Sequence, residues 1–278
     1  MANRLVKEIL IDALKISDDE AYKQDIYYLA QKAFSLSLEE LILKENEVVD
    51  DNIFNQYLKR YLDKEPLYYI LGKAPFYRRE FIVNNKVLIP RNETEELVYL
   101  TIKKIKEKKL TNPKIIDVGS GSGCISITLD KEIIDSLVTG VDISLEALEV
   151  AKANNKNLEA NVNFYQSDCL KNVLKNKEKF NALISNPPYI DKEQFVEESV
   201  LKYEPHLALF AEKKGLAIYE KIFLDLDLVL EEHGFAIFEI SPDLKDGLIE
   251  LLRLILPNYR YEFIFDINHF LRFLYIEK

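Results

Sequence analysis

The chain has 278 residues, of which 48% are hydrophobic, enough for one large domain or two modest ones with a substantial core. Its 37 basic and 47 acidic side chains give a net charge of −10, and neither the first 75 residues nor the rest of the chain is basic. This balance argues against a surface built for the phosphate backbone of a nucleic acid. The two cysteines, Cys124 and Cys169, indicate neither a disulfide framework nor a zinc site.

No targeting or membrane segment is evident in the sequence. The N-terminal residues alternate between charged and apolar types and lack the apolar stretch of a secretory signal, and no apolar run approaches the length of a membrane span. His206, His233 and His269 are too scattered for metal-ligand spacing, so we expect no metal. These features predict a cytoplasmic protein. We expect a monomer that contacts neither a membrane nor a nucleic acid directly.

Residues 1–74 are predicted to form a small helical bundle. Apolar residues recur at helical spacing in the stretches 5–14, 26–34 and 54–62. Asp18 precedes the second stretch, and Ser37 with Glu40 has the pattern of a capping box. Aromatic residues at this spacing usually pack in a core. We therefore assign no chemistry to this domain and expect it to position a partner.

Residues 75–92 are predicted to form a β-hairpin linker, after a short helix that Gly72 ends. The expected strands are 75–77, 81–83 and 87–90, with a tight turn at Asn84 and Asn85. A helix with acidic residues in its first turn then begins the third predicted domain, residues 93–278.

A buried strand, a glycine-rich turn and a helix form the first unit of a Rossmann-like sheet in this domain. The turn has the sequence Asp117-Val118-Gly119-Ser120-Gly121-Ser122-Gly123. Its glycines alternate and lack the G-x-G-x-x-G spacing of dinucleotide-binding proteins, and a carboxylate precedes them. This pattern suits a ligand that carries an ammonium group and no pyrophosphate.

The next two predicted strands each lead to an aspartate. Residues 137–141 end at Asp142, the usual position of a carboxylate that accepts hydrogen bonds from both hydroxyls of a ribose. Residues 162–165 lead to Asp168, which either accepts from the amino group of an adenine or caps the next segment. Alone, each piece is also consistent with a packing turn or a helix cap. Together they favour a nucleoside with a cationic amino-acid arm.

A fourth buried strand, residues 180–184, ends in Ser185-Asn186-Pro187-Pro188-Tyr189. Two consecutive prolines remove two backbone donors, which leaves a rigid turn with carbonyl acceptors. The side chain of Asn186 and the carbonyls of Asn186 and Pro187 can together hold both hydrogens of a planar NH₂ group, and Tyr189 offers a ring beside it. On its own the stretch is slightly more typical of a simple turn. The glycine motif shifts the balance towards a site that acts on a planar nitrogen.

These motifs resemble the class I S-adenosylmethionine-dependent methyltransferases, and four dispersed motifs resemble one family, the bacterial and organellar peptide chain release factor glutamine methyltransferases. The four are Pro66-Leu67-x-Tyr69-Ile70-Leu71-Gly72, Leu88-Ile89-Pro90-Arg91-x-Glu93-Thr94-Glu95, Asn186-Pro187-Pro188-Tyr189-Ile190, and Glu204-Pro205-x-x-Ala208-Leu209 with Gly215-Leu216. The match covers nearly the whole chain. It implies an α/β, Rossmann-like, seven-stranded methyltransferase domain with an N-terminal helical domain that docks the substrate. The last predicted elements fit that sheet: a helix at 215–231 and strands at 234–240, 259–265 and 270–276.

The resemblance implies methyl transfer from S-adenosyl-L-methionine to the side-chain amide nitrogen of the glutamine in the Gly-Gly-Gln loop of a translation release factor. The implied cofactor contacts are Asp117, Gly119, Ser120, Gly121, Ser122, Gly123, Asp142, Asp168, Cys169 and Asn186. The implied catalytic residues are Asn186, Pro187 and Tyr189, and Pro188 joins them in binding the substrate. Methylation of an exocyclic amine in DNA or RNA, and a noncatalytic cofactor-binding module, are the alternatives.

The chain departs from the family pattern at three places. Asn92 replaces the usual proline after the arginine, which loosens the turn of the linker without removing a charged group. Phe210 and Ala211 stand where the family has glycines ahead of Gly215, which predicts a less mobile lid. Cys169 replaces a bulkier residue near the adenine.

Overall fold

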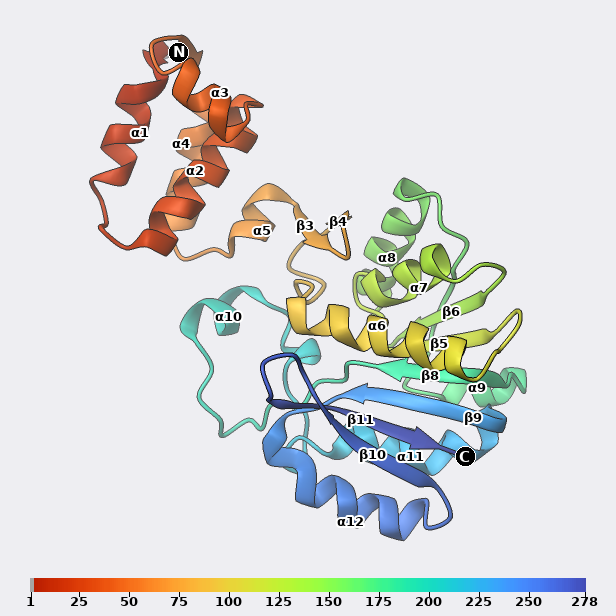
Figure 1. Cartoon of the computed structure of the whole chain (residues 1–278). Coiled ribbons are helices and arrows are strands. Elements are labelled where there is room, and N and C mark those ends of the chain that lie inside the picture. Colours follow the sequence, from red (N-terminus) through yellow and green to blue (C-terminus); the bar gives the residue numbers. More distant parts are fainter. Residues whose placement is uncertain (1–2) are drawn as a thin grey trace. The chain divides into compact units, whose positions relative to one another are not determined.

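The computed structural model describes residues 3–278, which form two compact units (Figure 1). The N-terminal unit contains the chain up to Lys73 together with Glu198–Tyr203, and the larger unit contains Ala74–Glu197 and Glu204–Lys278. Residues 1 and 2 of the predicted helical domain lie outside the described residues. The sequence patterns do not predict that a segment from the middle of the chain packs with the N-terminal helices, because contacts between distant segments leave no local signal.

The N-terminal unit is mainly helical. Its helices are α1 (Val6–Leu14), α2 (Glu20–Phe34), α3 (Leu38–Leu43), α4 (Asn52–Leu62), α5 (Leu67–Leu71) and α10 (Glu198–Tyr203). The side chain of Asp19, one residue after the predicted Asp18, accepts a hydrogen bond from the Ala21 amide and caps α2. Ser37 and Glu40 form the predicted capping box, in which each side chain accepts from the other's amide.

The apolar faces of the helices α1 to α5 meet in one core. Its fully buried side chains include Val6, Ile26, Leu29 and Phe54. A short antiparallel pair, β1 (Asn3–Leu5) and β2 (Val48–Asp50), adds an element that the sequence does not predict. Three-residue strands hold too few positions to show an alternating pattern.

The hairpin after α5 turns at a different place from the one predicted. The strands β3 (Lys73–Phe76) and β4 (Arg79–Ile82) form a two-stranded sheet, so the turn lies at Tyr77 and Arg78, whose φ values are 48° and 62°. The predicted hairpin turn at Asn84 and Asn85 is therefore wrong. Two consecutive positive φ values normally favour asparagine and glycine, which is why Tyr-Arg carries no turn signal. The carboxylate of Glu95 accepts from the Tyr77 amide at 2.8 Å and helps to hold this turn.

The predicted third strand at 87–90 is also wrong. Val87 and Ile89 are buried, so the alternating pattern is real, but these residues are not in a strand. Asn84 makes a local turn, because its side chain and its carbonyl accept from the amides of Lys86 and Val87. The chain from 84 to 90 is an irregular segment that packs one side inward.

A seven-stranded sheet forms the centre of the larger unit, as predicted. In spatial order the strands are β10 (Arg260–Phe265), β11 (Leu271–Glu277), β9 (Leu230–Glu239), β8 (Phe180–Ser185), β5 (Lys114–Val118), β6 (Leu137–Asp142) and β7 (Asn163–Gln166). β11 is antiparallel to both of its neighbours, and the other pairs are parallel. From β5 the chain runs outward through β6 and β7 and then returns to β8 on the other side of β5. This reversal places a crevice at the carboxyl ends of β5 and β8.

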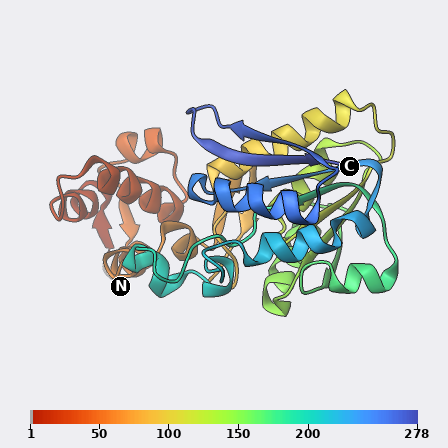
Figure 2. The same cartoon turned by 90° about the horizontal axis from the view of Figure 1, so that it is seen from below.

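Helices cover both faces of the sheet (Figures 1 and 2). One face carries α6 (Asn92–Glu107), α7 (Cys124–Glu132) and α8 (Leu145–Asn157), and the other carries α9 (Lys171–Asn176), α11 (Ala217–Val229) and α12 (Lys245–Ile255). Along β9, Phe235 and Ile237 pack in the core under α6, α7 and α8, whereas Ala236 and Phe238 pack in the core under α11 and α12. A strand buried on both faces reads as a continuous apolar run, which is why β9 is predictable. No helix in the described residues is both long and apolar enough to cross a membrane.

Candidate active site

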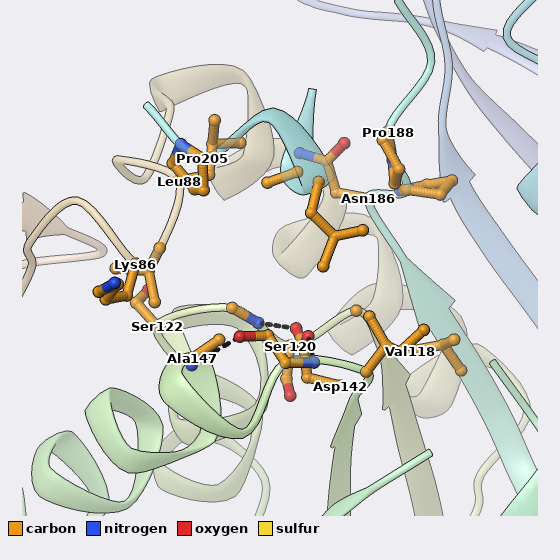
Figure 3. A pocket seen from close by; sticks show the side chains of 18 of the residues that line it. Lys86, Leu88, Val118, Ser120, Ser122, Asp142, Ala147, Asn186, Pro188 and Pro205 are labelled. Atoms are coloured by element: carbon orange, nitrogen blue, oxygen red, sulfur yellow. Dashed lines mark hydrogen bonds between the residues drawn. The ribbon is translucent and has the colours of Figure 1, made fainter. Parts of the chain in front are cut away.

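The glycine motif and the Asn-Pro-Pro turn lie side by side because β5 and β8 are neighbouring parallel strands. Asp117 pairs with Ile184, so the two strands end at the same level. The buried hydroxyl of Ser185 donates to the Val118 carbonyl at 2.6 Å and ties the two strand ends together. A cavity of about 460 Å³ opens at these ends, a volume typical of small-molecule sites (Figure 3).

The glycine-rich loop forms one wall of this cavity. Gly119, Gly121 and Gly123 have φ values of 80°, 52° and 79°, in the left-handed region that favours glycine. The loop folds back on β6, since the Gly119 amide donates to the Val141 carbonyl at 2.8 Å. A Cβ atom on Gly123 would lie 3.0 Å from the ring of Phe164, so this glycine lets α7 pack closely on the sheet. The loop residues that line the cavity are Val118, Gly119, Ser120, Gly121 and Ser122.

Asp142 ends β6 and also lines the cavity (Figure 3). Its Oδ2 accepts from the Gly121 amide at 2.9 Å, and its Oδ1 accepts from the Ser144 amide at 2.9 Å. The cap of α8 is Ser144, whose hydroxyl accepts from the Ala147 amide at 3.1 Å. Burial raises the pKa of Asp142. Each carboxylate oxygen keeps further acceptor capacity, so Asp142 can hold the loop and still accept from ligand hydroxyls.

Asp117 lies behind the glycine loop and is not among the residues that line the cavity. Its Oδ2 accepts from the Ser126 amide at 3.2 Å and from the Ser126 hydroxyl. Its Oδ1 is buried and has no hydrogen-bond partner within residues 3–278. Burial raises the pKa of Asp117 to about 7. The predicted contact of this carboxylate with an ammonium group stays a prediction.

Asp168 and Cys169 line the cavity beyond β7. The Asp168 carboxylate accepts from the Lys221 ammonium group at 3.2 Å. The sequence predicts Asp168 as one possible cap of the segment that follows it. In the structure, the hydroxyl of Ser167 accepts from the Asn172 amide at the start of α9. Burial raises the pKa of the Cys169 thiol to about 11, so the thiol is protonated at neutral pH. The roles of Asp168 and Cys169 beside an adenine stay predictions.

The Asn-Pro-Pro turn forms another wall, with Asn186, Pro187 and Pro188 among the lining residues; Figure 3 shows Asn186 across the cavity from Asp142. Tyr189 is not among them, because its ring packs against the core of the α11 face. Its backbone carbonyl approaches Gly215 so closely that a Cβ there would lie 2.3 Å from the oxygen, and Gly215 has a φ of 87°. Only glycine fits this approach. The predicted contact of the Tyr189 ring with a substrate amide stays a prediction.

Two residues outside the predicted site hold the side chain of Asn186. Its Nδ2 donates to Thr94 Oγ1 of α6 at 3.1 Å, and Thr94 Oγ1 donates to Glu239 Oε2 at the end of β9 at 2.7 Å. Burial raises the pKa of Glu239 to about 7, and the hydrogen bonds from Thr94 and Asn186 oppose this rise. Glu239 does have a sequence signal, since it is an acid at the carboxyl end of a buried parallel strand, as Asp142 is. Thr94 is recognisable only as part of the motif around Arg91.

Residues 85–91 and 205–208 complete the cavity wall. Arg91 donates to both carboxylate oxygens of the buried Glu204, at 2.6 and 2.8 Å, and this ion pair joins the two segments. After the turn, the Ile190 amide donates to the Leu209 carbonyl at 3.0 Å, and Ile190 forms an isolated bridge with Phe210. Phe210 therefore pairs with the chain that leaves the Asn-Pro-Pro turn, at the place where the family has glycines.

The comparisons with known proteins define the class. Residues 97–238 match the methyltransferase small domain family, and residues 10–72 match the PrmC N-terminal domain family. A methyltransferase of Pyrococcus furiosus shares the fold with a TM-score of 0.53 at 17% identity, over 81% of this chain and 98% of that one. The T. thermophilus 16S rRNA N2 G1207 methyltransferase has a TM-score of 0.54 at 14% identity, over 74% and 49% of the two chains. The larger unit is a Rossmann-like methyltransferase domain.

Curated relatives cover nearly the full length. The release factor glutamine methyltransferase of Staphylococcus aureus is 35% identical over 94% of this chain and 95% of its own length. The proteins of the same name from Streptococcus pneumoniae and Enterococcus faecalis are 40% and 41% identical, over 82% and 72% of this chain and 78% and 71% of their own lengths. The chain belongs to the release factor glutamine methyltransferase family.

Proposed function

We propose that this protein transfers a methyl group from S-adenosylmethionine to the side-chain amide nitrogen of the glutamine in the Gly-Gly-Gln loop of a translation release factor. The observation that carries the proposal is one cavity with two different walls. A glycine loop with Asp142 forms one wall, and a proline-locked turn that presents the anchored Asn186 amide forms another. The curated relatives named for glutamine methylation support the choice of substrate.

The charges of the cavity fit S-adenosylmethionine. The lining side chains of Lys86, Arg91 and Lys221 are each paired with a carboxylate, at 2.8, 2.6 and 3.2 Å, which makes the cavity a poor phosphate site. Asp142 has acceptor capacity for the ribose hydroxyls, and the loop at Gly119 and Gly121 offers open space at its backbone. The cofactor supplies a methyl group that is already activated by a sulfonium centre.

The turn residues Asn186 and Pro187 would orient the substrate amide. An amide nitrogen is a poor nucleophile because its lone pair is delocalised, so alignment is the main requirement. Asn186 Oδ1 and the Pro187 carbonyl would accept the two N–H groups of the glutamine. As the nitrogen gains positive charge the same acceptors stabilise it, and its proton is then lost to solvent. No strong base is needed.

We assign docking of the intact release factor to the helical domain 1–74, with 75–92 as a linker and 93–278 as the methyltransferase domain. The exposed apolar side chains Ile42, Leu43 and Val48 of the N-terminal unit, at 64%, 82% and 60% exposure, support an interaction surface there. A short Gly-Gly-Gln peptide should then be a much poorer substrate than the intact factor, because remote binding energy supports turnover. Steady-state kcat/KM values for the two substrates measure this difference, and equal values would contradict the assignment.

We further propose that the protein acts in the cytoplasm as a monomer and does not contact nucleic acid directly. The net charge of −10 supports the last point, since it disfavours association with a phosphate backbone. The two free cysteines, Cys124 and Cys169, suit a reducing compartment. Sedimentation analysis at micromolar concentration tests the monomer.

Intact-mass and peptide mass spectrometry of a release factor incubated with the protein and cofactor test the main proposal. We expect one added methyl group on the Gly-Gly-Gln glutamine and none when that glutamine is replaced by alanine. An unmodified factor, with methyl label recovered in DNA or RNA, would replace the proposal with exocyclic amine methylation. Cofactor binding without transfer to any of these acceptors would favour a noncatalytic module.

A further inference from the structure

Three side chains from three separate elements form a hydrogen-bonded chain behind the catalytic turn. Asn186 follows β8, Thr94 lies in the first turn of α6 and Glu239 ends β9. The distances along the chain are 3.1 Å from Asn186 Nδ2 to Thr94 Oγ1 and 2.7 Å from Thr94 Oγ1 to Glu239 Oε2. Thr94 and Glu239 are each 3% exposed, so water competes little for these bonds.

The chemistry of the three groups gives this chain one direction. In its ionised form the Glu239 carboxylate only accepts hydrogen bonds, so it obliges the single Thr94 hydroxyl hydrogen to point at it. The oxygen of Thr94 is then left as an acceptor, and only the NH₂ end of Asn186 can satisfy it. A flipped Asn186 amide would set its own oxygen against the Thr94 oxygen, near a carboxylate, which is repulsive.

The backbone around Glu239 is also fixed. The buried hydroxyl of Tyr219 in α11 donates to the Glu239 carbonyl at 2.6 Å. The carboxylate is therefore held on a strand end that is bonded to a second helix. Because its backbone is fixed, the Glu239 carboxylate can keep the orientation of the Thr94 hydroxyl constant.

We propose that Thr94 and Glu239 are positioning residues that lock the amide of Asn186 with its carbonyl oxygen presented to the substrate nitrogen. This inference rests on the proposed glutamine methylation and deepens it, because it identifies what distinguishes an aligned acceptor from a freely flipping amide. Neither residue needs to touch the reacting atoms. Both act through Asn186.

The first test compares Thr94→Val, Thr94→Ser and Thr101→Val. Valine keeps the shape of threonine and removes the hydroxyl, so kcat on the release factor should fall on the order of tenfold while the Kd for S-adenosylhomocysteine changes by less than about twofold. Serine restores the hydroxyl and should recover most of the lost turnover. Thr101 is a matched control, since its buried hydroxyl in the same helix donates to the Leu97 carbonyl at 2.8 Å and Thr101 is not among the cavity-lining residues.

A second variant, Glu239→Gln, tests the direction of the chain. Glutamine has nearly the same shape, but its NH₂ group can donate to Thr94 and so permit the flipped Asn186 amide. We expect a loss of kcat of similar size to that of Thr94→Val. Glu239→Gln with full turnover would overturn the role of Glu239, and Thr94→Ser as impaired as Thr94→Val would overturn that of the Thr94 hydroxyl.

A double-mutant cycle separates action through Asn186 from a general packing effect. If Thr94 works through Asn186, Thr94→Val should cost little further turnover in an Asn186→Ala background, measured in single turnovers at high enzyme concentration. An equal fold-loss in both backgrounds would overturn the inference.

A spectroscopic readout keeps the inference testable even if the release factor is not the substrate. The side-chain amide signal of Asn186, identified by its loss in Asn186→Ala, should be protected from hydrogen exchange in the unaltered protein and lose that protection in Thr94→Val. An identical signal in both proteins would overturn the positioning role. Inactivity of the unaltered protein on the factor, with the NMR difference present, would overturn the proposed function alone.

Discussion

The two walls of the cavity are built in different ways. On the glycine-loop side, Asp142 bonds the backbone amide of Gly121, and the Gly119 amide bonds the carbonyl of Val141, so the wall is held largely by backbone groups of two successive strand ends. On the side of the Asn-Pro-Pro turn, Asn186 is held by the side chains of Thr94 and Glu239, which lie 92 positions before it and at the end of another strand. The first wall is local in sequence, and the second is assembled from distant parts of the chain.

This difference suggests that the two walls have different functions. A wall of backbone amides and one carboxylate is suited to binding a ligand that is the same in every turnover. A wall of oriented side-chain acceptors is suited to stabilising charge that appears only during the reaction. Changes on the first wall should therefore alter affinity, and changes on the second should alter turnover.

The largest effect is expected for Asn186→Ala. Loss of an acceptor for the developing positive charge should lower kcat by roughly 100-fold, by analogy with removal of an oxyanion-hole donor, with little change in cofactor affinity. Turnover by mass spectrometry and Kd for S-adenosylhomocysteine by calorimetry measure the two quantities. Asn181→Ala is the control, because Asn181 lies at the opposite end of β8, where its side chain accepts from the Lys114 amide. Near-normal turnover of Asn186→Ala would reduce the motif to a structural turn.

Asp142→Ala changes the glycine-loop wall and should mainly alter affinity. Loss of a charged acceptor for two ribose hydroxyls, together with a loosened glycine loop, should raise the Kd for S-adenosylhomocysteine on the order of tenfold or more. Glu149→Ala removes a carboxylate from an exposed position of α8 and serves as the control. A kcat that falls far more than affinity would break the proposed division between the walls.

The smallest effect is expected in the pH dependence of stability without cofactor. Burial raises the pKa of Asp117 to about 7, above its unfolded value near 4, so the folded state binds more protons between these values. The free energy of unfolding should therefore fall as pH rises from about 4 to about 7. A change of about 1 kcal/mol in the free energy of unfolding would already move Tm by about 2 to 4 °C.

Thermal unfolding followed by circular dichroism, which suits a chain without tryptophan, measures this slope. In Asp117→Asn the contribution of this carboxyl is absent, so the curve should be flatter, although Glu239, whose pKa burial also raises to about 7, still contributes. Parallel curves for the two proteins would show that Asp117 does not titrate in this range.

The wall that is local in sequence was also the one most open to prediction. The glycine motif and Asp142 sit at ends of strands that the hydrophobic pattern identifies, and parallel topology brings such ends together. Of the other wall, only the Asn-Pro-Pro turn was predictable in the same way. The sequence could not show that Asp117 is buried without lining the cavity or that the Tyr189 ring packs against the core. Those outcomes depend on side-chain direction at a strand end, which residue type does not determine.

The misplaced hairpin turn and the missed role of Thr94 have related causes. The turn at Tyr77 and Arg78 carries no glycine or asparagine, whereas Asn84 and Asn85 have the composition of a hairpin turn and lie beyond β4. The sequence places Thr94 in a helix start and in the motif around Arg91 but gives it no role in the site, because its partners Asn186 and Glu239 are distant in sequence. Local patterns find elements and motifs, and they do not find side-chain networks that cross three elements.

The placement of α10 matters for anyone who wants to shorten the protein. This helix follows the Asn-Pro-Pro turn in the chain, yet it packs in the N-terminal unit, where the Tyr203 hydroxyl donates to the Asp63 carbonyl at 2.9 Å. The two units are therefore not consecutive modules that one cut can separate. A fragment that starts near residue 74 would keep α10 while losing the residues on which it packs, directly before the Glu204 that anchors Arg91. A minimal catalytic fragment should also replace α10 with a short linker, and exchanging N-terminal domains between relatives would require transplanting α10 with them.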